Sequence, residues 1–391
     1  MRHIGWLVAV ILVAWPGRAA DRRHTVQELR DRVAAAQHTG KSDIDLAKEL
    51  SGMELSEELP ASEMGRLVAL LPGPLSTEQL YVLEARNAAL PPPPENLPAI
   101  AAPDEAEQHA MLAKAREWTA NVYAQLPPLS ARCLIARFQD GYAEAVTTTG
   151  AKQANDRSRE AIPAQGGLDI RLINKHLDKA RFVNGIEVET VFTETTEPGG
   201  NGVSALVEEP LSPNAILQEA MDGRGLRFLR WESVNGWRLA AFSFEVDKKK
   251  TQFGLAYQAV SIESKPVGGI ETNGGAVTTS TVVNNVVSRS FHHRAGYAGE
   301  VFIEPDSGVV LRTITEAAFK PDSIFHSETI RTDYARLPVA GKTLVVPVRR
   351  FKITEFVPGD RQTAKQDAVR HNFVTEDFKD FQLADATPTL N

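Results

Sequence analysis

The sequence contains one cysteine and few aromatic residues, and after its first twenty residues it has no apolar run long enough to cross a membrane. Cys133 alone cannot form an internal disulfide, so the fold must be held by a core, which 391 residues can supply. Its apolar neighbours indicate a buried, inert thiol rather than a nucleophile. The net charge of -7 gives no electrostatic support to nucleic-acid binding.

Catalytic and cofactor signatures are also missing from the sequence. It has no Gly-x-Ser-x-Gly elbow, phosphate loop, dinucleotide fingerprint or His-Glu-x-x-His motif, so we expect no cofactor and no metal. His292 and His293 are adjacent, and adjacent residues on a strand point to opposite faces, so the pair is not expected to share a metal ion. The isolated histidines that the fold could bring to a carboxylate are His176, His326 and His371.

The first residues show the three parts of a secretory signal. The basic start of Arg2 and His3 is followed by the apolar run Ile4–Trp15 and by small residues at Gly17 and Ala19. The apolar run is too short to span a bilayer comfortably, so we expect a signal peptide over residues 1–19. The alternative is an uncleaved membrane anchor. The prediction is an exported protein, periplasmic or extracellular, without stable membrane insertion after signal cleavage.

Residues 20–90 have the pattern of a small helical region. Thr25 and Glu28 form a capping box before an apolar stripe, and Ser76 and Gln79 have the same spacing. The expected helices are one that begins after Thr25 and three more over Asp43–Leu50, Ser62–Leu71 and Ser76–Ala89.

Two segments of unusual composition follow. Six prolines among residues 91–103 favour polyproline II, so this segment is predicted to be a Pro-rich linker. Residues 266–288 contain four glycines among Thr, Asn and Val and no aromatic residue. We expect this second segment to form a mobile loop or a protruding hairpin.

Residues 104–391 are predicted to form a helix plus an antiparallel β domain, so the fold class is α+β. The long helix, about Asp104–Gln125, carries an apolar stripe around Trp118 and should lie against a sheet. Strands joined by tight turns follow, and Asn184-Gly185 and Asn235-Gly236 suit type I′ hairpins. The expected architecture is a large curved antiparallel sheet, half-barrel-like, covered by the long helix.

One predicted hairpin concentrates aromatic residues. Phe242 and Phe244 share a face because side chains alternate along a strand. The aromatic group either forms the sheet core under the Trp118 helix or partly lines an apolar groove for a lipid or a hydrophobic peptide. The candidate ligand-binding residues are Trp118, Phe228, Trp231, Trp237, Phe242 and Phe244.

Several segments resemble a family of exported bacterial proteins of uncharacterised function. They are Leu50–Leu59, Leu71–Pro74, Pro91–Pro94, Phe228–Trp231, Tyr297–Glu304, Thr332–Tyr334 and Val339–Lys342. The matching segments are turns and caps, so the resemblance implies no activity and no catalytic residue. The order of strands and turns is also similar to that of the LolA and RseB type of half-barrel, an antiparallel sheet curved around a helix.

Two functions from different classes fit these observations. The first is a non-enzymatic exported binding or scaffold protein, whose curved sheet takes a hydrophobic ligand or an envelope protein partner. The alternative is a secreted hydrolase with a site assembled from dispersed histidine and aspartate residues. That site requires a histidine within hydrogen-bond reach of both a carboxylate and a nucleophile.

Overall fold

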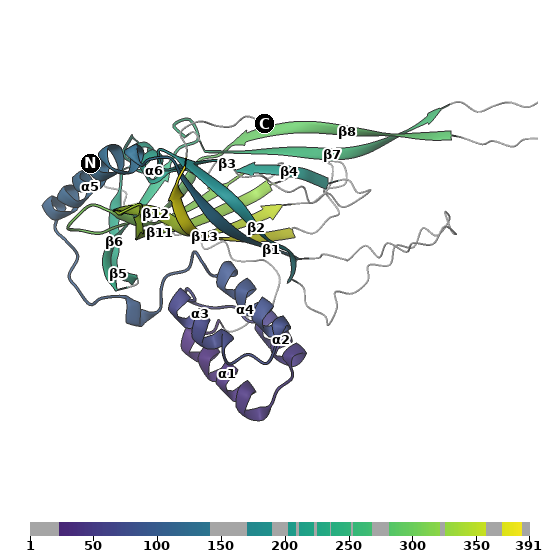
Figure 1. The fold of residues 1–391 in the computed structure, drawn as a ribbon, viewed down its shortest axis with the longest axis horizontal. Helices are drawn as coiled ribbons and strands as arrows, with labels where there is room; N and C mark the ends of the chain where they lie inside the picture. The colour runs from purple at the N-terminus through teal and green to yellow at the C-terminus, as the bar shows by residue number, and fades with distance from the viewer. Residues whose placement is uncertain are drawn as a thin grey trace, which may run out of the picture.

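The computed structural model describes residues 23–140, 170–189, 202–208, 211–222, 225–234, 236–251, 253–267, 281–320, 325–356 and 370–384. The predicted signal peptide lies outside these ranges. Within them the chain is an α+β protein with a ten-stranded antiparallel sheet, a three-stranded sheet and a group of N-terminal helices (Figure 1). No helix in the described part of the chain has both the length and the hydropathy needed to cross a membrane.

Four short helices form where the sequence predicts them. They are α1 (Val26–Thr39), α2 (Asp43–Ser51), α3 (Ala61–Val68) and α4 (Pro74–Arg86). The Thr25–Glu28 capping box is present, with both of its hydrogen bonds at 3.1 Å. The apolar stripes of the helices pack into a small core of their own around Leu29, Leu46 and Leu80.

The predicted capping box of Ser76 and Gln79 is wrong. Helix α4 begins at Pro74, two residues earlier, so Ser76 lies inside the first turn and is buried. The cap comes from another helix: the Asp43 carboxylate accepts from the N–H groups of Leu75 and Ser76, at 3.0 and 2.8 Å. A carboxylate at a helix N-terminus satisfies free donors and suits the helix dipole.

The Pro-rich segment 91–103 is not a free spacer. It contains the short 3-10 helix η1 (Pro94–Asn96) and contacts the protein on both sides. The Pro91 carbonyl accepts from the Glu58 N–H at 2.7 Å, and the Ala101 carbonyl accepts from the Trp231 indole at 2.9 Å. These bonds tie the segment to the helical region and to the sheet.

The large sheet has the order β3-β2-β1-β13-β12-β11-β10-β9-β6-β5, and it is open because its described edge strands, β3 and β5, do not pair. The last strand in the described part of the chain, β13, inserts between β1 and β12, so the first and last described strands of the large sheet are neighbours. The strands are β1 (Leu129–Asp140), β2 (Ile170–Val183), β3 (Ile186–Glu189), β5 (Arg227–Val234), β6 (Trp237–Val246), β9 (Tyr297–Ile303), β10 (Val310–Ala318), β11 (Phe325–Val339), β12 (Lys342–Phe356) and β13 (Arg370–Leu383).

Both predicted Asn-Gly hairpins are present. Asn184 and Gly185 have φ of 52° and 75° between β2 and β3, which is the left-handed pair that a type I′ turn requires. Gly236 has φ of 81° between β5 and β6. The smaller sheet has the order β4-β7-β8, from β4 (Gly202–Glu208), β7 (Gly254–Val267) and β8 (Thr281–Arg294). Of the segment 266–288, predicted to be a mobile loop or a protruding hairpin, residues 268–280 lie outside the described ranges. The residues on either side of them belong to β7 and β8, which pair with each other.

The long helix α5 (Glu105–Asn121) begins at a capping box of Asp104 and Glu107, and η2 (Tyr123–Gln125) follows it. The structure confirms the large curved antiparallel sheet, but it does not show a long helix covering it. Instead, α5 contacts the β9–β10 turn, where Lys114 Nζ donates to the carbonyls of Pro305 and Asp306 at 3.3 and 3.1 Å. The shorter α6 (Pro213–Asp222) lies beside α5 (Figure 1).

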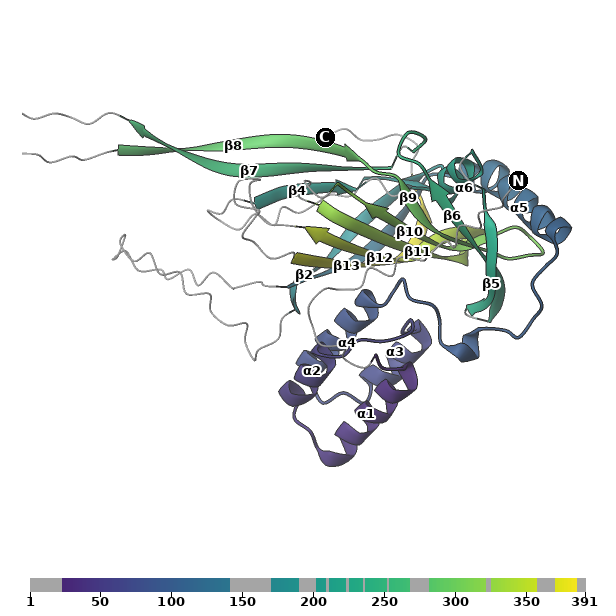
Figure 2. The ribbon, with the colours of Figure 1, turned by 180° about the vertical axis from the view of Figure 1, so that it is seen from behind.

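The elements form layers around the ten-stranded sheet. In both views the helices α1–α4 lie on one side of it and the strands of the smaller sheet lie on the other, with α5 and α6 at one end (Figures 1 and 2). The main apolar core joins α5 and α6 to the strands and includes Trp118, Ile216, Phe242 and Val301. A second cluster joins α4 to the opposite face of the sheet through Val82, Ala85, Phe351 and Phe373.

Candidate functional site

One face of the large sheet carries a row of alternating charges. Arg312, Asp333, Arg349 and Asp377 are successive cross-strand neighbours on β10, β11, β12 and β13. Arg312 Nε lies 2.6 Å from Asp333 Oδ1, and Arg349 Nε lies 3.2 Å from Asp377 Oδ1. Opposite charges that face each other across strands stabilise a sheet. The N-terminal helical region packs against this row.

The helical region supplies two carboxylates to that face. Glu84 of α4 accepts two hydrogen bonds from Arg349, both at 2.7 Å. Glu58 lies 2.7 Å from Arg331 and 3.0 Å from Arg312. All five side chains are largely removed from water, so each charge depends on the partner it meets.

Burial and neighbouring charge act in opposite directions on these carboxylates. Burial raises the pKa of Glu84 to about 7, although the Arg349 guanidinium opposes the shift. Burial also acts to raise the pKa of Asp333, but Arg312 and Arg331 outweigh it and lower that pKa to about 2. These paired groups lie where the N-terminal helices contact the sheet.

The opposite face of the sheet holds a second buried ionic group. Arg350 Nη1 lies 2.6 Å from Glu187 and 2.8 Å from Glu376, and Lys352 Nζ lies 2.9 Å from Glu376. Glu187 belongs to β3 and Arg350 to β12, with β2, β1 and β13 between them in the sheet. Side chains separated by three strands can meet only if the sheet curves strongly, and this face is therefore its concave face.

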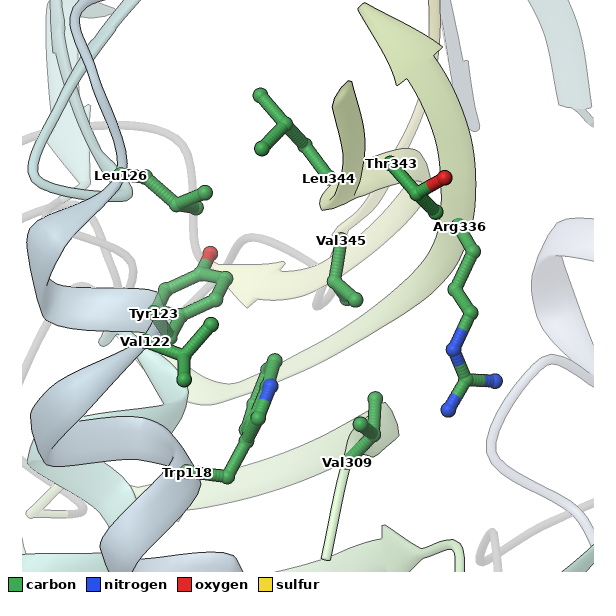
Figure 3. A pocket seen from close by; sticks show the side chains of 9 residues that line it. All are labelled: Trp118, Val122, Tyr123, Leu126, Val309, Arg336, Thr343, Leu344 and Val345. Carbon is green, nitrogen blue, oxygen red and sulfur yellow. The ribbon is translucent and has the colours of Figure 1, made fainter. Parts of the chain in front are cut away.

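A pocket of about 190 Å³ opens on this concave side, between the end of α5, η2 and strands β11 and β12 (Figure 3). Its lining residues are Trp118, Val122, Tyr123, Leu126, Val309, Arg336, Thr343, Leu344 and Val345. The Trp118 and Tyr123 rings are in contact, with centroids 5.4 Å apart. Val122 is half exposed, which places it at the mouth of the pocket.

Arg336 is the one charged side chain among the nine that line the pocket (Figure 3). Its Nη2 donates to Glu304 at 2.5 Å, and its guanidinium group stacks on the Trp237 ring, 4.5 Å from the centroid. Its Nη1 is buried and has no hydrogen-bond partner among the described residues. Because Glu304 already balances the charge, this free donor suits a neutral acceptor oxygen better than a second anion.

Tyr123 connects the pocket to the edge of the sheet. Its hydroxyl donates to the Gly185 carbonyl in the β2–β3 turn at 3.0 Å, and its ring meets Tyr334 edge-on at 6.0 Å. Burial raises the pKa of Tyr123 well above its usual range, so the hydroxyl stays protonated and acts as a donor. The back of the pocket is therefore held by groups from η2, the β2–β3 turn and β11 together.

The sequence-predicted aromatic residues fall into two groups. Trp118 lines the pocket, and the half-exposed Trp237 lies beneath the Arg336 side chain. The other four pack together as part of the apolar core: Phe228 contacts Trp231 and Phe242, and Phe244 contacts Tyr297. Tyr123, Leu126, Arg336 and Leu344 were not predicted from the sequence, because no motif relates η2 to strands more than 200 residues away.

The structure places one predicted histidine beside a carboxylate and a serine. Ser327, Glu355 and His371 are cross-strand neighbours on β11, β12 and β13. Ser327 Oγ donates to Glu355 Oε2 at 2.8 Å, and His371 Nε2 lies 3.7 Å from Glu355 Oε1. The carboxylate stands between the serine and the imidazole. A hydrolase needs the imidazole next to the nucleophile, so this order does not activate the serine. His326 precedes Ser327 on β11 and also acts on this row: the hydrogen bond from His371 lowers the pKa of Glu355, and the charge of His326 acts in the same direction.

The remaining predicted histidines lie on other strands. His176 lies 3.6 Å from Asp178, and His292 and His293 stand on β8 opposite Ala256 and Leu255. No group of three or more potential metal ligands occurs in the described ranges. Cys133 is buried, and burial raises the pKa of its thiol, as expected for an inert cysteine. Comparisons of the chain with protein-family models, curated proteins and solved structures give no match.

Proposed function

We propose that the chain is an exported, non-enzymatic binding protein that holds a small apolar ligand in the pocket beside Trp118. The pocket itself carries this proposal: eight of its nine lining side chains are uncharged, and its back wall is fixed by hydrogen bonds and ring contacts. Apolar pockets with a few well-placed polar groups are the usual form of small-molecule sites. The export part of the proposal is supported by the signal pattern of residues 1–19.

The size of the pocket limits the ligand. An apolar cavity of about 150 Å³ binds benzene in a well-studied engineered protein. A pocket of about 190 Å³ therefore suits one ring with a short substituent, or a short branched chain. A longer chain would have to leave past Val122, which is exposed. The free Nη1 of Arg336 would donate a hydrogen bond to a carbonyl, ether or hydroxyl oxygen of the ligand.

Part of the proposal concerns the shape of the site. We propose that α5, through Trp118, closes the concave side of the sheet, as the helix does in the LolA and RseB type of half-barrel. The shared core between Met111, Trp118 and the strand residues Phe242 and Tyr334 supports this arrangement. An envelope protein that delivers or receives the ligand is the partner that fits such a site.

The hydrolase alternative has weaker support. It requires His371 to reach a nucleophile, whereas Ser327 bonds to Glu355. The Ser327–Glu355–His371 row is instead a chain of side-chain contacts that connects three strands. The purified chain and its Ser327→Ala variant are assayed for hydrolysis of a generic ester. Hydrolysis by the wild type that is lost in the variant would support the alternative.

The binding proposal is tested by filling the pocket. Purified chain is examined by native mass spectrometry for a retained small molecule and then titrated calorimetrically with benzene, indole and short-chain alcohols. We expect binding by the wild type and a loss of about tenfold or more in Val345→Phe, because the added ring occupies the ligand volume. Leu229→Phe, on the exposed surface of β5, is the control and should bind as the wild type does. Equal binding by Val345→Phe and wild type would overturn the proposal.

A further inference from the structure

The outer face of β1, β2 and β13, opposite the concave side of the sheet, carries a row of like charges. Lys179 of β2, Arg132 of β1 and Lys379 of β13 are successive cross-strand neighbours, and all three are exposed. Their chain neighbours Cys133 and Phe378 are buried in the apolar cluster on the concave side, so the three cations point outward. Like charges that face each other across strands destabilise a sheet. The stability of the fold therefore does not explain this row.

The carboxylates near this face do not balance its charge. Asp380 lies 3.1 Å from Arg132, and Asp377 is already paired with Arg349. The exposed lysines of the face form no ion pair with another described residue, and they are Lys175, Lys179 and Lys379. The chain as a whole has a net charge of -7, so this positive surface is a local feature. A concentrated positive field attracts a negatively charged partner.

Apolar side chains stand among these cations. Leu177 lies between two of the lysines on the outward side of β2 and is 56% exposed. On the neighbouring strand β3, Ile186 and Val188 are 49% and 52% exposed. They flank Glu187, whose buried carboxylate meets Arg350 on the concave side, so both point outward as well. The face therefore combines uncompensated positive charge with exposed branched apolar groups.

We propose that this outer face of β1, β2, β3 and β13 docks on the surface of an anionic phospholipid membrane. A lysine or arginine side chain near an anionic bilayer strengthens binding by about fivefold. Leu177, Ile186 and Val188 enter the boundary between headgroups and acyl chains, which is how peripheral surfaces gain affinity from apolar side chains. The aliphatic stems of the lysines lie along the same boundary while their ammonium groups reach the phosphates. A soluble acidic partner would use the cations but would leave the apolar groups without a role.

Vesicle sedimentation tests the electrostatic part of the proposal. The purified chain is mixed with vesicles of phosphatidylcholine alone, or of phosphatidylcholine and phosphatidylglycerol in equimolar amounts. We expect stronger binding to the mixed vesicles. The combined variant Lys175→Gln, Lys179→Gln and Lys379→Gln should weaken that binding by about a hundredfold, because three cations are lost. Residues 1–19 are the same in the variant and the wild type, so they cannot cause this difference.

The control removes the same charge from another surface. Lys248, Lys249 and Lys250 are exposed in the loop after β6 and give the densest run of lysines in the chain. Their replacement by glutamine should leave vesicle binding as in the wild type, and circular dichroism of both triple variants should match that of the wild type. Equal losses in the two triple variants, or no loss in the first, would overturn the proposal.

A fluorescent label separates a membrane from a soluble polyanion. Leu177→Cys is labelled with an environment-sensitive dye, which attaches at this position because the native Cys133 is buried. Its emission should shift to shorter wavelength with the mixed vesicles and stay unchanged with heparin. The same label at Leu229→Cys, on the exposed surface of β5, should respond to neither. A response at residue 177 to heparin and not to vesicles would assign the face to a soluble acidic partner and overturn membrane docking.

Discussion

Glu84 and Arg349 are joined by two parallel hydrogen bonds of 2.7 Å across the boundary between α4 and the large sheet. The carboxylate comes from the N-terminal helices and the guanidinium from a central strand, so this one pair connects the two parts of the molecule. Glu84 is 2% exposed. A bidentate pair fixes the relative orientation of its two side chains as well as their distance. It therefore fixes the position of α4 over the charged row on the sheet.

Removal of one partner of this pair should be costly. Arg349→Ala leaves the Glu84 carboxyl buried without its counterion, and we expect the free energy of unfolding to fall by about 3 kcal/mol. Glu84→Leu combined with Arg349→Met should recover most of the loss, since an apolar pair needs no counterion. Arg32→Ala removes the more exposed Arg32–Glu49 contact and should cost less than about 1 kcal/mol. Urea unfolding measures all three, and equal losses in Arg349→Ala and Arg32→Ala would contradict the prediction.

The same carboxyl should make stability depend on pH near neutrality. Burial raises the pKa of Glu84 from 4.5 to about 7, so between these values the folded protein holds a proton that the unfolded chain has released. The contribution of Glu84 to stability is therefore present below about pH 4.5 and is lost as the pH rises toward 7. The loss is about 3 kcal/mol. Unfolding at a series of pH values should show this slope, and Glu84→Gln should flatten it.

Gly308 allows α5 to contact the β9–β10 turn. Its φ is +73°, and a Cβ at this position would lie 2.4 Å from the Lys114 carbonyl carbon in the backbone of α5. Gly308→Ala should therefore combine backbone strain with displacement of the helix, at a cost of about 2 to 4 kcal/mol. Gly341 also has a positive φ, +79°, but it has open space around it, so Gly341→Ala should cost only about 1 to 2 kcal/mol. The stabilities of the two variants are compared by thermal unfolding. An equal loss of stability would show that α5 does not press on the turn.

The single cysteine should be unreactive in the native protein. Cys133 is buried on β1, and burial raises the pKa of its thiol, so little thiolate is present at neutral pH. Iodoacetamide should not modify the folded chain during an incubation that fully modifies the chain in urea. Mass spectrometry counts the added groups, and rapid labelling of the folded protein would contradict the burial of this side chain.

Several features could be predicted because they depend on neighbouring residues. The capping box of Thr25 and the Asn184-Gly185 turn each need only a few residues in sequence, and both are present. The cap of α4 was predicted wrongly for the opposite reason: its acceptor, Asp43, belongs to another helix. The residues of the candidate site also differ in whether neighbouring residues predict them. Trp118 was found from its place on an amphipathic helix, whereas Arg336 and Leu344 line the pocket only because distant strands are adjacent.

The amino-acid order by itself determined which segments become helices, strands and turns, because hydrophobic period and turn chemistry act over a few residues. Only the tertiary structure decided that β13 enters between β1 and β12, and that Glu58 and Glu84 meet Arg331 and Arg349. Strand pairing can join residues at any separation along the chain, and a buried charge is stable only beside the partner that the fold brings to it. The pocket beside Trp118 arises from the same long-range pairing.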